Sequence, residues 1–136
     1  MKHHEFVAAV RQRGEYGSAA EAEAVIRAVL GVLAARLTPD EAHDLASQLP
    51  EGIAEILEEQ SQQPTLRLSV QEFLQRIAAG TGATTRTAEW DAGAVLSTVA
   101  DAITDGEFND LITQLPSGYA DLFGNVAVRR PGPPSV

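Results

Sequence analysis

The chain has 136 residues, the length of one ordinary domain, and 44% of them are hydrophobic while only 5% are aromatic. Such an aliphatic, alanine-rich composition favours helices over sheets. The formal net charge of −9 argues against binding to a phosphate backbone, and the absence of cysteine excludes disulfides and thiolate chemistry.

The first predicted helix begins near the N-terminus, where Phe6, Val7 and Val10 form an apolar face. Ser18 is a favourable N-cap for a second helix, and Glu21 lies three residues on, as a capping box requires. The apolar stripe of this second helix recurs at helical spacing and consists of Ile26, Val29, Leu30, Leu33 and Leu37. No apolar run reaches the roughly 20 residues that span a bilayer, and no signal peptide precedes the first helix. We therefore expect a cytoplasmic protein with no membrane partner.

The third predicted helix has the clearest start, because Thr38 is a cap, Pro39 suits the first helical position and Glu41 completes a capping box. Pro50 is expected to end this helix, since the residue before a proline avoids helical geometry. A short fourth helix then buries the apolar residues Ile53, Ile56 and Leu57.

Residues 61–68 are predicted to form a polar linker, and residues 125–136 a flexible tail without an apolar pattern. The segments 66–68 and 126–128 each alternate briefly between apolar and polar residues. They pair as a short two-stranded ribbon in one interpretation, although isolated ribbons are only marginally stable. Whether they do so is left open by the sequence.

The second half repeats this order of elements. Ser69 and Glu72 cap a helix that starts the second half, Thr84 caps the next, and Thr104 with Glu107 follows the logic of the earlier capping box. The inward-facing residues of these helices are Phe73, Leu74, Ile77, Val95, Leu96, Val99, Ile103, Phe108, Leu111, Ile112, Leu115, Tyr119, Leu122 and Phe123.

An internal duplication explains this repetition. With an offset of 66 residues, 11 of the 23 positions in 28–50 match those in 94–116, including Gln-Leu-Pro at the end of both segments. We expect two tandem four-helix repeats, 3–60 and 69–124. A unit of about 60 residues has a marginal core of its own. The fold class is therefore predicted to be all-α, a compact bundle of about eight helices with pseudo-two-fold symmetry, in one domain over residues 1–124.

Three stretches carry a family resemblance: residues 68–77, residues 94–111, and Gln-Leu-Pro-Ser-Gly-Tyr-Ala-Asp-Leu-Phe at 114–123. In this order and spacing they resemble the bacterial domain of unknown function 2267 family, over roughly residues 3–124. The resemblance implies a small, mostly helical bacterial protein of the cytosol with no established activity. It supplies no catalytic residue.

One candidate polar site is a stripe that occurs in both repeats: Glu41, Asp44 and Gln48, and again Glu107, Asp110 and Gln114. Spacings of three and four place each trio on one helix face. The functional hypothesis is a pair of related sites for a metal or polar ligand. The structural interpretation, which we favour, is that the glutamates close capping boxes and the glutamines satisfy backbone groups beside the prolines.

Two further candidates are contact surfaces. The fourth helix carries an acidic face, which is either a contact for a basic partner or simply solvated: Glu51, Glu55, Glu58 and Glu59. Trp90 is the only tryptophan and stands where the first repeat has Ala24, so it is either an interface anchor or, as we expect, part of the core. His3, His4 and His43 are too scattered to predict a metal site.

The leading functional hypothesis is a non-enzymatic protein-interaction module, which binds an unidentified protein partner or forms a homodimer. The alternative is a small-molecule-binding protein or weak enzyme that uses carboxylates at the junction of the repeats, with Asp44 and Asp110 as the first candidates. Catalytic, cofactor-binding and metal-binding residues are not predicted, and neither is nucleic-acid binding.

Overall fold

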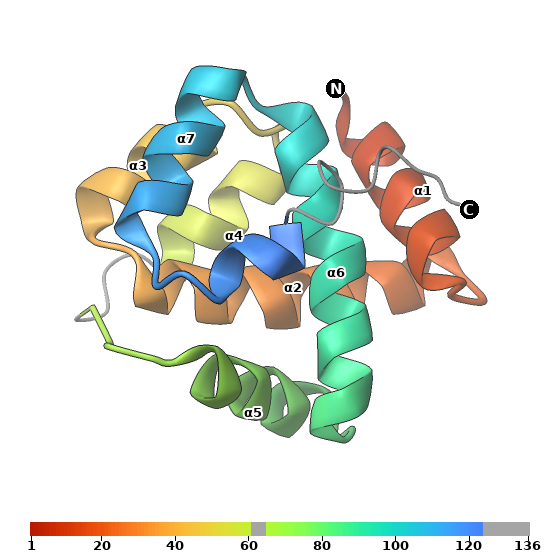
Figure 1. Ribbon diagram of the computed structural model, residues 1–136. Helices are drawn as coiled ribbons and strands as arrows, with labels where there is room; N and C mark the ends of the chain where they lie inside the picture. The colour runs from red at the N-terminus through yellow and green to blue at the C-terminus, as the bar shows by residue number, and fades with distance from the viewer. Residues whose placement is uncertain (61–64, 124–136) are drawn as a thin grey trace, which may run out of the picture.

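The computed structural model describes residues 1–60 and 65–123, and within these ranges the chain is all-α, with no strand (Figure 1). Residues 119–123 form a short additional helical segment after seven longer helices. The seven are α1 (His3–Gly14), α2 (Ala19–Arg36), α3 (Pro39–Ala46), α4 (Ile53–Gln60), α5 (Val70–Thr81), α6 (Thr85–Ala102) and α7 (Asp105–Gln114). The predicted tail at 125–136 and the segment 126–128 lie outside the described residues, as do residues 61–64 of the predicted linker.

Local capping chemistry sets most of the helix starts. At Thr38 and at Ser69 the side chain accepts from the backbone N–H three residues on, and the glutamate there accepts from the cap residue's own N–H, as predicted. Ser18 also caps its helix, by accepting from the backbone N–H of Glu21 at 3.1 Å. The capping box predicted there is incomplete, however, because the Glu21 carboxylate accepts from the N–H of Gly17 instead, at 3.0 Å.

The end of α3 lies earlier than the proline rule predicts. The helix ends at Ala46, four residues before Pro50, and turns fill the interval. The carbonyl of Pro50 accepts from the N–H groups of Ile53 and Ala54, both at 3.0 Å. Pro50 therefore opens the turn that leads into α4 as well as preventing α3 from continuing.

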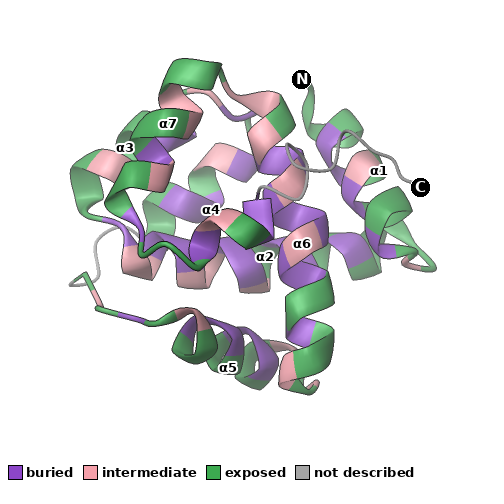
Figure 2. Ribbon diagram, viewed as in Figure 1, coloured by how far each residue is buried: buried purple, intermediate pink, exposed green. Residues whose placement is uncertain are grey.

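The core is one contiguous cluster that draws on both halves of the chain, with the buried faces of the helices turned inward (Figure 2). α2 packs against α1, α4, α5 and α6. α1 packs against both α2 and α6, and α5 likewise packs against both α6 and α2. The first helix of each half therefore completes its burial on the opposite half, as the marginal size of one unit led us to expect.

Aromatic contacts fix the C-terminal part of this core. The rings of Phe73 and Tyr119 meet edge to face at 5.0 Å, and those of Phe108 and Phe123 do so at 5.9 Å. The buried Tyr119 hydroxyl donates to the carbonyl of Leu68 at 2.8 Å, which ties the segment before α5 to the last helical turn. None of the described helices is both long and apolar enough to cross a membrane.

Candidate functional site

The polar stripes predicted from the duplication meet where α3 and α7 lie side by side (Figure 1). The side-chain Oε1 of Gln48 accepts from the backbone N–H of Thr104, the N-cap of α7, at 2.8 Å. Thr104 accepts from the N–H of Glu107 at 3.1 Å. The prediction that Glu107 closes a capping box is therefore wrong, because Gln48 from the other half already occupies the N–H that such a box would use.

Carboxylates from both halves approach one another at this junction. The pKa of Glu107 is raised above its ordinary value, first by partial burial and then by the charges of Asp44 and Asp110. Asp44 lies on α3 and Asp110 on α7, and both are exposed. Gln114 does not repeat the role of Gln48: it is exposed, and its recorded contact is a backbone carbonyl that accepts from Arg36 at 3.4 Å. The two stripes are alike in sequence and differ in their contacts.

The histidines and acidic residues do not assemble a metal site in the described ranges, where no group of three His, Asp or Glu side chains is placed to hold an ion. His3 contacts the Glu51 carbonyl through Nδ1 at 3.1 Å and the Glu23 carboxylate through Nε2 at 3.5 Å. His43 contacts the carboxylate of Glu58 at 3.1 Å.

The acidic face predicted on α4 is exposed along its length. Its members Glu51, Glu55, Glu58 and Glu59 all face solvent. The Glu55 carboxylate also accepts from the backbone N–H of Gly52 at 2.5 Å, which helps to start α4. This face is thus partly a local capping arrangement, and Glu58 within it contacts His43.

Trp90 corrects our expectation of core packing, because its side chain is 54% exposed. Its indole Nε1–H donates to the carbonyl of Gly14 at 3.0 Å, at the end of α1. This position of α6 faces the end of a neighbouring helix and not a buried layer, and its counterpart Ala24 is likewise exposed. The hydrogen bond fixes a large aromatic side chain at the surface.

Next to Trp90 lies a polar network between α1 and α6 that the sequence analysis missed. Arg13 donates to the hydroxyls of Ser97 and Thr98 at 3.0 and 3.2 Å and forms an ion pair with Asp101. Its counterpart in the second half is Gly80, so the network exists on one side only. Positions where the two copies differ in polarity were the signal that could have revealed it.

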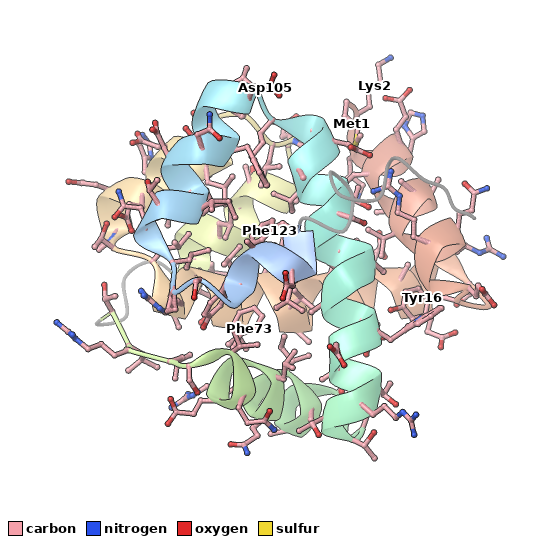
Figure 3. The ribbon with its side chains drawn as sticks, in the orientation of Figure 1. Met1, Lys2, Tyr16, Phe73, Asp105 and Phe123 are labelled. Carbon is pink, nitrogen blue, oxygen red and sulfur yellow. The ribbon has the colours of Figure 1, made fainter. Side chains whose placement is uncertain are left out.

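Tyr16 makes a separate contact with α6, at a buried carboxylate. Its hydroxyl donates at 2.5 Å to the carboxylate of Asp91, which is only 4% exposed. Burial, followed by the interaction with Asp91, raises the pKa of Tyr16. A Cβ atom at Gly14 would overlap the Tyr16 ring, so glycine is needed at that position. Tyr16 lies beyond the end of α1, beside the start of α2 (Figure 3).

A cavity of about 520 Å³ adjoins Tyr16 on the other side of α1. It runs between one face of α1 and the start of α2, from His3 and Glu23 to Glu15 and Tyr16. Its volume lies within the range of roughly 300–1,000 Å³ that is usual for small-molecule sites. Its lining includes His3 and His4, which the sequence did not place in a metal site, and none of the predicted polar-site or contact residues.

Comparison with known proteins agrees with the resemblance found in the sequence. The model of a family described as "Uncharacterized conserved protein (DUF2267)" matches residues 3–122. No curated protein matches the chain. The match covers most of the chain, which therefore belongs to the DUF2267 family.

Proposed function

We propose that this member of the DUF2267 family is a non-enzymatic protein-interaction module of the bacterial cytoplasm, and that it binds a basic protein partner through the surface around Trp90. The observation that carries the proposal is the indole of Trp90, 54% exposed and held by a hydrogen bond to the Gly14 carbonyl. Tryptophan is one of the residue types most enriched among the interface residues that dominate binding energy.

The rigidity of the neighbouring backbone supports this proposal. Arg13 joins α1 to α6 through contacts with three side chains, and Tyr16 joins the following turn to α6 through Asp91. A surface that is ordered before binding loses less conformational entropy on association than a loop does. Trp90 would therefore be presented on a preorganised support.

The charge of the chain supports a basic partner over a second copy. At a net charge of −9, two copies repel one another, whereas a basic surface is attracted. The exposed acidic face of α4 adds to this attraction. If the chain instead self-associates through Trp90, the partner is a second copy and the protein is a homodimer.

The test uses Trp90 as a built-in probe, because it is the only tryptophan. The partner is a protein that the wild-type chain and the neighbouring control Glu89→Gln both capture and that Trp90→Ala does not. This protein is purified and titrated against the chain. We expect the tryptophan emission to shift to shorter wavelength on binding, and the affinity to fall with added salt. Equal capture by the wild type and Trp90→Ala would refute the proposal. So would a concentration-dependent dimer that binds no partner.

We further propose that the fold is a tandem duplication with pseudo-two-fold symmetry in a single domain over residues 1–124. The helix lengths support it, because α1 and α5 both have 12 residues, and α2 and α6 both have 18. In addition, α1 contacts α2 and α6 just as α5 contacts α6 and α2. Superposition of residues 3–60 on residues 69–123 in an experimental structure tests this, and helix directions that do not superpose would refute it.

A second candidate function rests on the α3–α7 junction, where the raised pKa of Glu107 beside Asp44 and Asp110 would suit the binding of a polar ligand or weak acid–base chemistry. If so, a ligand that binds there perturbs the NMR signals of both aspartates, and Asp44→Asn weakens its binding. Binding that is unaffected by Asp44→Asn and Asp110→Asn would exclude this site.

A further inference from the structure

α7 is the least buried of the seven helices. Leu111 is its only buried residue, whereas each of the other six helices buries at least three. Phe108 and Ile112 pack against the core but are only partly buried. Because a helix in a protein is stabilised mainly by the packing of its apolar face, little packing holds α7 in place.

Side chains of the first half contact α7 at both ends. The Gln48 side chain accepts from the N–H of Thr104 at 2.8 Å, and Arg36 donates to the carbonyl of Gln114 at 3.4 Å. α1, α2, α5 and α6 pack on one another through contacts in which α7 has no part. Breaking the two end bonds therefore frees α7 without disturbing those four helices.

The charges at the α3–α7 junction oppose the contact. Each of the two helices has three acidic residues and no Lys or Arg: Asp40, Glu41 and Asp44 on α3, and Asp105, Glu107 and Asp110 on α7. Partial burial, and then the charges of Asp44 and Asp110, raise the pKa of Glu107, so the repulsion crosses the junction. α3 is also the helix that α7 contacts most.

The first turn of α7 is intrinsically weaker than that of α3. With the offset of 66 residues, Asp105 stands where α3 has Pro39, and Gly106 stands where α3 has Asp40. Pro39 fixes the backbone at the first helical position, whereas Gly106 loses more conformational freedom on folding than any other residue type would.

We propose that α7 is a flap that opens from the core as one unit while α1 to α6 stay folded. The hinges are Ile103 and Leu115, the extended residues on either side of it. The next segment is anchored separately, because the Tyr119 hydroxyl donates to the Leu68 carbonyl at 2.8 Å. Opening would move the Phe108 ring away from the Phe123 ring, which is fully buried when α7 is closed. The proposal does not depend on the role of Trp90.

The test is native-state hydrogen exchange of the full chain, followed by NMR at low concentrations of urea. We expect the amides of residues 108–114 to have similar protection factors, at least about tenfold lower than those of the core amides of α2. Urea should accelerate their exchange much less than that of the α2 amides, because a local opening exposes less surface than global unfolding.

A glycine substitution tests whether α7 itself sets this exchange. Gly106→Ala should slow the exchange of the α7 amides about two- to fivefold, because alanine has less backbone entropy to lose. An added Cβ atom at Gly106 meets no atom within 4 Å. Gly93→Ala in α6 has equally open space and is the matched control, which should leave the exchange of the α7 amides unchanged.

A substitution outside α7 separates its opening from unfolding of the whole chain. Arg13→Ala removes the contacts of α1 with Ser97, Thr98 and Asp101 on α6. It should accelerate exchange of the α2 amides about fivefold or more and leave that of the α7 amides as in the wild type. The proposal is overturned if the α7 amides exchange as slowly as those of α2, if Arg13→Ala accelerates both sets equally, or if Gly106→Ala slows the α7 amides no more than Gly93→Ala does.

Discussion

The hydrogen bond from the Thr104 N–H to Gln48 makes a sharp prediction, because the duplication provides a matched control. In Gln48→Ala the N-cap N–H of α7 loses its acceptor at 2.8 Å from the other half. Gln114 occupies the same repeat position, but its side chain is exposed. We expect Gln48→Ala to destabilise the fold, and Gln114→Ala to have almost no effect.

The size of the loss follows from what can replace the bond. A net contribution of about 0.5–1.5 kcal/mol is usual for one hydrogen bond. In the first half, the equivalent N–H of Thr38 is satisfied by Glu41 at 3.1 Å. In Gln48→Ala, Glu107 becomes free to do the same for Thr104, which should keep the loss near the lower end, at about 0.5 kcal/mol. Glu107→Gln in addition takes away the replacement, so the double variant should be about 0.5–1 kcal/mol less stable than the sum of the two single effects predicts.

The assay is urea unfolding followed by far-ultraviolet circular dichroism, with melting temperatures as a second measure. For a chain of this size, 1 kcal/mol corresponds to about 3–5 °C. NMR titration should also show the pKa of Glu107 fall in Gln48→Ala, because the carboxylate moves to the N-terminus of α7. Equal losses for Gln48→Ala and Gln114→Ala, or additive effects of Gln48→Ala and Glu107→Gln in the double variant, would refute this account of the junction.

Three further predictions concern buried and ionisable groups and the junction of the halves. Tyr119→Phe removes a buried hydroxyl bonded at 2.8 Å and should cost about 1–3 kcal/mol in urea unfolding. Burial raises the pKa of Tyr119 from 10.0 to about 12. Its contribution to stability is therefore complete below pH 10 and is lost between pH 10 and 12. An equally steep fall of the unfolding free energy with pH in Tyr119→Phe would contradict this. Because the pKa of Glu107 is raised, its contribution to stability is present below pH 4.5 and is lost as the pH rises. Glu107→Gln should therefore be more stable than the wild type at pH 7 but not at pH 4. Equal urea midpoints for the variant and the wild type at both pH values would be inconsistent with the raised pKa. Finally, residues 1–60 and 65–136 expressed separately should not melt cooperatively in calorimetry, and two cooperative transitions would disprove the dependence of each half on the other.

The parts of this fold that the sequence predicts well are local ones. Helix starts at Thr38 and Ser69 depend on atoms three residues apart, and the structure has the predicted capping boxes there. The apolar stripe of α2 is likewise buried as periodicity requires. The all-α class and the family also follow from the sequence.

The contacts that the sequence did not predict join residues far apart in the chain. Whether Glu107 closes its own capping box depends on Gln48, which lies 56 residues before Thr104. The exposure of Trp90 depends on where α1 ends, and the cavity beside α1 depends on how Tyr16 is held by Asp91, 75 residues later. The equal spacing of residues within the two copies gives no information about these contacts, because they form only when the two halves pack together.

The packing of α1 on α6 also sets an order of events during synthesis. The contact of Arg13 with Asp101 spans 88 residues, so the surface of α1 that α6 covers stays open until most of the chain has been made. Contacts of such long range slow folding relative to a bundle whose neighbours are adjacent in sequence, since a large loop must close first. Until then the nascent first half presents the apolar residues of α1 and α2 to its surroundings. The slowest step in reaching the native state should therefore be the docking of α6 on α1. Loss of the Arg13 contacts would slow this step and also destabilise the native fold.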